Sequence, residues 1–153
     1  MIKFDLTEDL KKQFQEDGFL ILENFLDHQL IPHLTEKFPK LFSGDFETGI
    51  EPDEWNWKRG RDPENVTRQI CNAWKSDKSI KNLVCHEAIG KACAQLMNWN
   101  GSRLLQDNVL WKPPGGKTLS YHQDAAYDDW ILPQTMPAPG GPQCNQPCSA
   151  LVS

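Results

Sequence analysis

Three adjacent residues have types and spacing suited to metal chemistry: His122, Gln123 and Asp124. If residues 118–124 form a strand, alternate side chains share a face, so His122 and Asp124 point the same way. An imidazole and a carboxylate at this spacing can bind one metal ion, and they are two of the three ligands in the 2-His-1-carboxylate set that holds non-haem Fe(II). The motif fits equally a histidine hydrogen-bonded to a neighbouring carboxylate, so both interpretations stay open at this point.

Helices are predicted in the chain that precedes this motif. Thr7 is suited to cap a first helix and Gly18 to end it, while Asp27 is suited to cap a second helix that Gly44 ends. Between the two helices, the continuous apolar run at residues 19–22 predicts a buried strand. Two more helices are expected at residues 66–75 and 79–99.

The segment between the second and third predicted helices, residues 43–65, is a long loop with several Gly and Pro residues. Loops of this length inside a domain are often functional. Trp55 and Trp57 fit two interpretations: a lid over a site, or a loop held against the body of the protein by its two indoles.

After residue 100 the apolar pattern changes to a period of two, which predicts a strand over residues 103–111. One face of that strand would carry Leu105, Asp107, Val109 and Trp111, and the other Leu104, Gln106, Asn108 and Leu110. The turn formers at residues 113–116 then lead the chain back toward residues 118–124.

Composition limits the classes of partner. The formal charge is −5 and no basic cluster is present, which argues against nucleic acid and anionic membranes as partners. A small-molecule substrate is expected instead. The five cysteines are an odd number and form no C-x-x-C pair, which suits free thiols in a reducing compartment. Without an apolar leader, a spanning segment or a C-terminal peroxisomal signal, a cytoplasmic location is expected.

Three separated stretches together resemble the phytanoyl-CoA dioxygenase family of Fe(II)- and 2-oxoglutarate-dependent oxygenases. They are DGFLILENFL at 17–26, QDNVLWKPPGG at 106–116 and YHQDA at 121–125. The resemblance implies an α+β fold: a helical N-terminal portion followed by the first strands of a double-stranded β-helix, or jelly roll, which would be incomplete here. It also implies hydroxylation of a small organic or acyl substrate, with conversion of 2-oxoglutarate to succinate and CO₂.

The resemblance assigns roles to individual residues. His122 and Asp124 correspond to the first two iron ligands, and Asn108 and Gln123 correspond to positions that line the 2-oxoglutarate site. The family tends to place a lysine for the co-substrate in the stretch that here has the sequence Arg68-Gln69-Ile70, so this chain departs from the family pattern there.

The sequence after the motif departs further from the family pattern, which needs a distal histidine and a basic residue for 2-oxoglutarate. Residues 125–153 contain no His, Arg or Lys, and residues 135–153 contain four Pro, two Gly and two Cys. We therefore expect two parts, 1–134 from the N-terminal part of a dioxygenase-like domain and 135–153 as a divergent tail. On this hypothesis the chain is a C-terminally truncated member and inactive, and the alternative function is that of a binding or regulatory module.

The other histidines (His28, His33 and His86) are predicted to be surface or capping residues.

Overall fold

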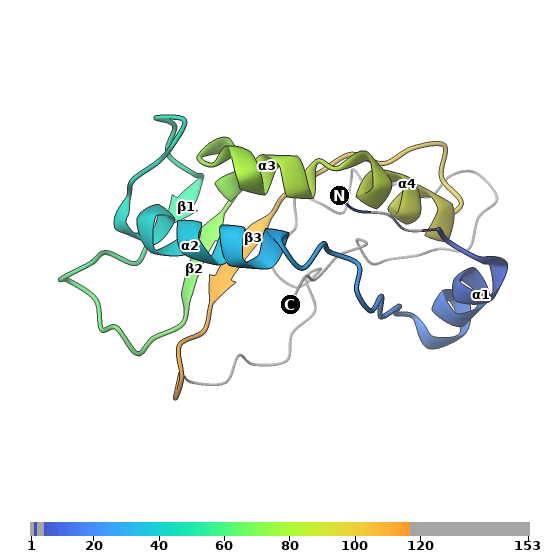
Figure 1. The fold of residues 1–153 in the computed structure, drawn as a ribbon, viewed down its shortest axis with the longest axis horizontal. Coiled ribbons are helices and arrows are strands. Elements are labelled where there is room, and N and C mark those ends of the chain that lie inside the picture. Colours follow the sequence, from blue (N-terminus) through green and yellow to red (C-terminus); the bar gives the residue numbers. More distant parts are fainter. Residues whose placement is uncertain (1, 3–4, 117–153) are drawn as a thin grey trace, which may run out of the picture. The chain divides into compact units, whose positions relative to one another are not determined.

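The computed structural model describes Ile2 and residues 5–116 (Figure 1). The elements are α1 (Glu8–Asp17), α2 (Leu30–Ser43), β1 (Glu54–Trp55), β2 (Arg68–Cys71), the 3₁₀ turn η1 (Ala73–Lys75), α3 (Lys78–Val84), α4 (Glu87–Leu96) and β3 (Asn108–Trp111). The strands form an antiparallel sheet in the order β1-β2-β3. This part of the chain is therefore α+β, and none of its helices is long and apolar enough to cross a membrane.

Both ends of α1 and the end of α2 lie where the sequence predicts. Thr7 Oγ1 accepts a hydrogen bond from the Leu10 backbone N–H at 3.3 Å, which satisfies one of the free donors of the first turn. Gly18 and Gly44 end α1 and α2 in the left-handed conformation, with φ of 77° and 87°. The predicted cap of α2 is wrong: the N-cap is Gln29, and Asp27 Oδ1 accepts from the N–H of Gln29 at 3.0 Å and not from an N–H of the first helical turn.

The hydrophobic core lies between α2 and one face of the sheet. Its buried members are Leu34, Leu41, Phe42, Trp57, Ile70, Ala73 and Ile80. The Phe42 and Trp111 rings meet edge to face with centroids 5.6 Å apart, which joins α2 to β3. Full burial of each large apolar side chain stabilises the fold by about 1.5–3 kcal/mol, so this contact surface fixes the sheet against the helix.

The long loop at 43–65 contains β1 and is held against the body of the protein by its two tryptophans. Trp57 is only 6% exposed, and its Nε1–H donates to the Pro63 carbonyl at 3.1 Å. The Trp55 Nε1–H donates to the Phe42 carbonyl at 3.2 Å. The structure therefore favours the second interpretation of the two indoles, a loop anchored by them.

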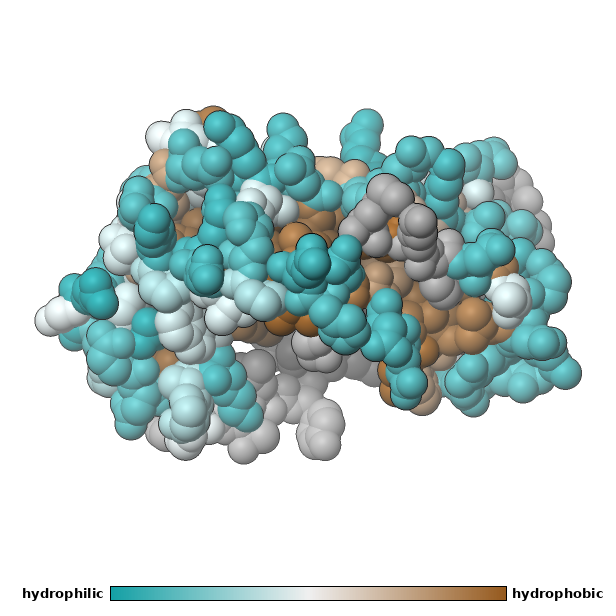
Figure 2. Space-filling view, viewed as in Figure 1, coloured by the Kyte–Doolittle hydropathy of each residue, from teal (hydrophilic) through white to brown (hydrophobic). Residues whose placement is uncertain are grey.

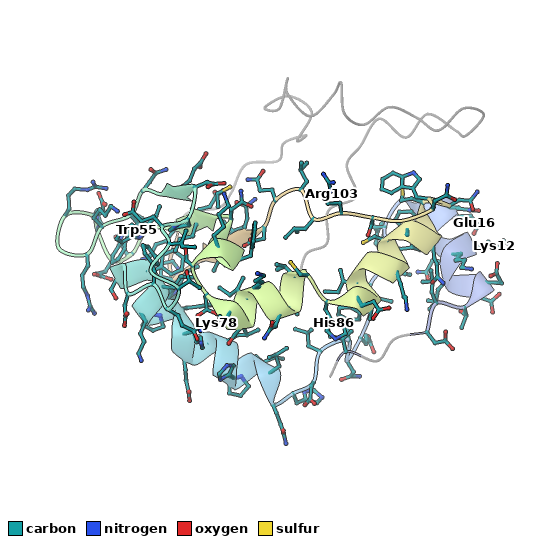
Figure 3. All side chains as sticks on the ribbon, turned by 90° about the horizontal axis from the view of Figure 1, so that it is seen from above. Lys12, Glu16, Trp55, Lys78, His86 and Arg103 are labelled. Atoms are coloured by element: carbon teal, nitrogen blue, oxygen red, sulfur yellow. The ribbon has the colours of Figure 1, made fainter. Side chains whose placement is uncertain are left out.

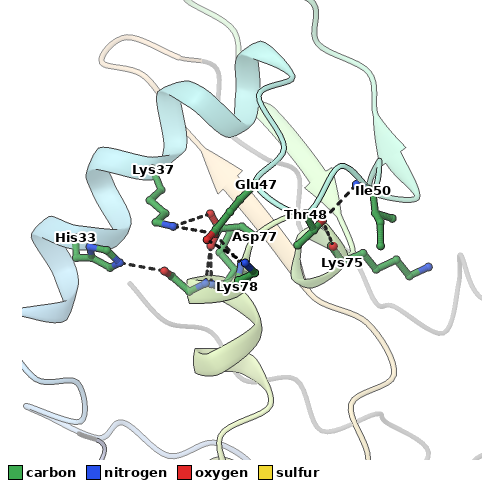
Figure 4. Close-up of polar contacts among 10 residues, drawn as sticks. His33, Lys37, Glu47, Thr48, Ile50, Lys75, Asp77 and Lys78 are labelled. Carbon is green, nitrogen blue, oxygen red and sulfur yellow. Dashed lines mark hydrogen bonds and ion pairs between the residues drawn. The ribbon is translucent and has the colours of Figure 1, made fainter.

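A polar cluster joins α2 to the start of α3 (Figure 4). Lys37 Nζ lies 3.0 Å from a Glu47 carboxylate oxygen and 3.3 Å from one of Asp77. Asp77 also caps α3, because its Oδ1 accepts from the Ser79 and Ile80 N–H groups. Figure 4 also shows the 3.0 Å contact between His33 Nε2 and Ser79 Oγ. These bonds hold α2 and α3 together on the polar side of the core.

Two predicted helices are wrong. Residues 66–75 form β2 and η1 instead of a helix: in β2 the side chains of Arg68 and Ile70 are buried and that of Gln69 is exposed, an alternation that belongs to a strand. The predicted helix at 79–99 is two helices, α3 and α4. The break falls at His86, whose Nδ1 accepts from the Ala88 N–H at 3.1 Å and caps α4 (Figure 3).

The predicted strand at 19–22 is also wrong. In the described part of the chain no strand pairs with these residues, and the side chains of Phe19 and Ile21 are 56% and 73% exposed. The face shown in Figure 2 is mostly hydrophilic, with apolar areas between the hydrophilic ones. The strand expected over 103–111 is shorter and begins at Asn108.

Two helix-ending glycines offer a matched test of the packing around Trp55. An alanine at Gly18 or Gly44 must adopt a left-handed backbone, which costs about 1–2 kcal/mol. A Cβ at Gly44 would also overlap the Trp55 ring, whereas a Cβ at Gly18 would meet nothing within 4 Å. We expect urea unfolding to show that Gly44→Ala costs about 1–3 kcal/mol more than Gly18→Ala, the usual range for overpacking. Equal costs would contradict the packing of Trp55 against the end of α2.

Candidate functional site

One face of the sheet packs on α2. We call the opposite face the open face, because the described residues leave Gln69, Asn108 and Leu110 exposed there, although Cys71 on the same face is buried. In the β2–β3 register Gln69 pairs with Leu110, and Cys71 pairs with Asn108. The side chains of Gln69, Asn108 and Leu110 are exposed, while those of Arg68 and Ile70 are buried on the core side. The period of two predicts that Asn108 and Leu110 share one face of the strand and Val109 and Trp111 the other, and the alternating exposure of β3 confirms this.

Asn108 presents a hydrogen-bond donor on this open face. Its Oδ1 accepts a hydrogen bond from Gln69 Nε2 at 2.9 Å, across the two strands. Because the carbonyl end of the carboxamide is used by Gln69, the Nδ2 amino group is the end that can bind a ligand. An amide N–H₂ donates two hydrogen bonds and is complementary to a carboxylate oxygen.

Cys71 and Gln106 lie beside this pair. Gln106 Nε2 is 2.6 Å from the Cys71 sulfur, and the thiol is buried. Burial raises the pKa of Cys71, because the thiolate would be poorly solvated there. The thiol is therefore neutral at physiological pH and a poor nucleophile, so the groups able to bind a ligand here are carboxamides.

The position of Asn108 is fixed by the residue before it. The Asn72 N–H donates to the Asp107 carbonyl at 2.8 Å, and the Asp107 N–H donates to Asn72 Oδ1 at 3.3 Å. Asp107 Oδ1 in turn accepts from the Trp74 N–H at 3.1 Å. Asn72 has a φ of 58°, in the left-handed region that Asn adopts more readily than most residues. These bonds join the end of β2 to the start of β3.

Arg68 does not reach the open face. Its guanidinium carbon lies 3.7 Å from the centroid of the Trp57 ring and 5.0 Å from that of Trp111, and Nη2 donates to the Glu64 carbonyl at 2.9 Å. The cation is thus enclosed on the core side of β2. In the stretch where the family tends to place a lysine, Gln69 is the residue beside Asn108. Sequence reasoning missed Gln69, because the residues Arg68-Gln69-Ile70-Cys71 show no polar–apolar alternation from which its outward direction could be predicted.

The predicted ligands His122 and Asp124, and the co-substrate residue Gln123, lie outside the described residues and remain predictions. Within Ile2 and residues 5–116, no three His, Cys, Asp or Glu side chains gather in a way that could hold a metal ion. His33 contacts Ser79 and His86 caps α4, as expected of surface or capping residues.

Comparison with known proteins identifies the family of this chain. The family described as Phytanoyl-CoA dioxygenase (PhyH) matches residues 14–144. The chain belongs to this family. It is also 28% identical over 122 residues to a 2-aminoethylphosphonate dioxygenase from Uncultured bacterium HF130_AEPn_1, a match that covers 78% of this chain and 45% of the relative. The chain thus spans less than half the length of this curated relative. No solved structure matches it.

The family and the relative are both named for dioxygenases. The matched segment includes the His122-Gln123-Asp124 motif and both strands that carry Gln69 and Asn108. The resemblance that the three short stretches indicate is therefore confirmed at the level of the family.

The buried Asp107 carboxyl gives a prediction about pH. Burial raises its pKa above the ordinary 3.8, and its Oδ2 is buried without a hydrogen-bond partner. The folded state therefore retains a proton that the unfolded chain has lost, so this residue's contribution to stability falls as pH rises from 3.8 to the raised pKa. Asp107→Asn removes the titration. We expect the free energy of unfolding of the variant, relative to the parent, to increase over this window in urea titrations.

Asp53→Asn is the control of opposite sign. Hydrogen bonds from Lys75 and then Asn72 hold the pKa of Asp53 below its usual range, so its contribution to stability is lost as pH falls. Relative to the parent, this variant should therefore become less stable as pH rises. A pH-independent difference for Asp107→Asn would contradict the assigned burial of that carboxylate.

Proposed function

We propose that this protein is a non-haem Fe(II)- and 2-oxoglutarate-dependent oxygenase that hydroxylates a small organic or acyl substrate. The observation that carries the proposal is the family match, which spans the His122-Gln123-Asp124 motif. The open sheet face is consistent with it, because Asn108, one of the residues that the family resemblance assigns to the co-substrate, presents an amide donor there.

The available donors fit the two groups that this chemistry needs. An imidazole from His122 and a carboxylate from Asp124 suit Fe(II), and the described residues offer no competing set of three ligands. 2-Oxoglutarate carries two carboxylates, which accept hydrogen bonds, and the carboxamides of Asn108 and Gln123 can donate them. When bound, the iron would activate O₂, which is the oxidant of this chemistry: one oxygen atom enters succinate as 2-oxoglutarate loses CO₂, and the other becomes the new hydroxyl group of the substrate.

The protein's own contribution is binding and orientation. In this proposal Asn108 donates to a carboxylate of 2-oxoglutarate, and the bonds between Asn72 and Asp107 hold the start of β3 so that this donor keeps its place. On the core side of the sheet, the Arg68 guanidinium lies against the rings of Trp57 and Trp111 and supports β2 from behind. Orientation of this kind can account for a large part of the catalysis of a reaction between bound partners.

Anaerobic titration of the full chain with Fe(II) and 2-oxoglutarate tests the proposal. We expect the charge-transfer absorption of an Fe(II)–2-oxoglutarate complex in the parent and its loss in His122→Ala and Asp124→Ala, because each variant removes one of two predicted protein ligands. His28→Ala, at an exposed histidine of the described region, is the matched control and should titrate like the parent.

Failure of the parent chain to bind Fe(II) with 2-oxoglutarate would contradict the proposal, as would equal binding by the His122 and Asp124 variants. Turnover can then be examined by succinate formation. Because the relative is named for 2-aminoethylphosphonate, that compound is the first substrate to test.

A second candidate function is a catalytically inactive binding or regulatory module. It is favoured by the composition of residues 125–153, which contain no His, Arg or Lys to act as a distal ligand or a partner for 2-oxoglutarate. Under this alternative the chain would retain its α+β body yet give no charge-transfer band and form no succinate.

A further inference from the structure

We propose that Gln69 is a positioning residue for the co-substrate: it holds the Asn108 carboxamide in the one orientation that presents an N–H₂ donor. The inference rests on the proposed function, because the ligand it concerns is 2-oxoglutarate. It adds a residue from the stretch Arg68-Gln69-Ile70, in which the family tends to place a lysine for the co-substrate and this chain has none.

The geometry of β2 and β3 brings the two carboxamides together. Gln69 lies opposite Leu110 and Asn108 lies opposite Cys71, so Gln69 and Asn108 are diagonal neighbours on one face of the antiparallel pair. Their side chains are joined by the 2.9 Å bond from Gln69 Nε2 to Asn108 Oδ1, although 39 residues separate them in the sequence. Both side chains are exposed on the face away from α2.

Without Gln69, the Asn108 carboxamide would not be held in one orientation. Rotating a carboxamide by 180° exchanges its oxygen and nitrogen, and one end accepts hydrogen bonds while the other donates them. A carboxylate ligand is bound by the nitrogen end and repelled by the oxygen end. The donor from Gln69 engages the oxygen of Asn108 and leaves the nitrogen for the ligand. A net hydrogen bond of ordinary strength changes such a preference by about 3- to 10-fold.

The packing of β2 allows the positioning role of Gln69 to be tested without loss of stability of the sheet. Arg68 and Ile70, on either side of Gln69, carry the burial of the strand, with 7% and 0% exposure. The Gln69 side chain is exposed, so its replacement removes no core contact. A substitution at Gln69 should therefore change the orientation of Asn108 while the sheet stays intact.

The experiment measures 2-oxoglutarate affinity anaerobically in the presence of Fe(II), using the full chain. We expect Gln69→Ala to weaken 2-oxoglutarate binding about 3- to 10-fold, with Fe(II) affinity and melting temperature unchanged. Gln69→Glu should weaken it more, because a glutamate accepts from Asn108 Nδ2, turns the oxygen outward and adds a negative charge. Gln95→Glu, the same change at an exposed position on α4, is the matched control and should bind like the parent.

A double-mutant cycle tests whether Gln69 affects 2-oxoglutarate binding through Asn108. If Gln69 acts through Asn108, then Gln69→Ala should cause no further loss in an Asn108→Ala background. An equal loss in both backgrounds would show that Gln69 acts independently of Asn108, and it would overturn the inference.

Two other outcomes separate this inference from the proposed function. If the parent binds 2-oxoglutarate and Asn108→Ala weakens binding while both Gln69 variants bind normally, the positioning role is wrong and the proposed function stands. If the parent chain binds no 2-oxoglutarate with Fe(II), the proposed function is wrong, and the role of Gln69 is wrong with it.

Discussion

The central strand of the sheet depends on an arginine enclosed between two indoles. Arg68 is 7% exposed and lies over the rings of Trp57 and Trp111, which come from the long loop and from β3. A buried guanidinium is costly unless aromatic faces and hydrogen bonds replace its hydration. Here the two indoles, the Glu64 carbonyl and the Glu64 carboxylate replace part of that hydration, while Nε is buried without a hydrogen-bond partner. One side chain thereby contacts the loop, β2 and β3 together.

The enclosure of Arg68 also determines which side chains face outward. Because strand side chains alternate, burial of Arg68 and Ile70 directs Gln69 to the opposite face. Antiparallel pairing with β3 then places Asn108 beside it. The core side of the sheet thus encloses a charged side chain, whereas the candidate site on the described strands consists of neutral amides.

How far the sequence predicts this structure depends on how local the signals are. Both ends of α1 and the end of α2 are predicted correctly because Thr7, Gly18 and Gly44 act on backbone groups only a few residues away. The sequence does not predict the strand β2, because Arg68 resembles a solvent-facing residue and its burial depends on partners distant in the sequence. The apolar run at 19–22 suggested a strand, but an apolar run does not identify a pairing partner. The period of two in the sequence predicts which face of the strand carries Asn108, whereas the sequence gives no such signal for Gln69. The roles of His122, Gln123 and Asp124 stay predictions.

The pairing of β2 with β3 also bears on the order of folding. The two amides that meet on the open face are 39 residues apart, and η1, α3 and α4 all lie between them. Helices form from neighbouring residues, whereas pairing distant strands first requires the closure of a long loop, which is entropically unfavourable and slow. The face that carries Gln69 and Asn108 is therefore expected to assemble after the helices. Until β3 docks, Asn108 and its neighbour Asp107 belong to an unpaired segment, and the donor on that face does not yet exist.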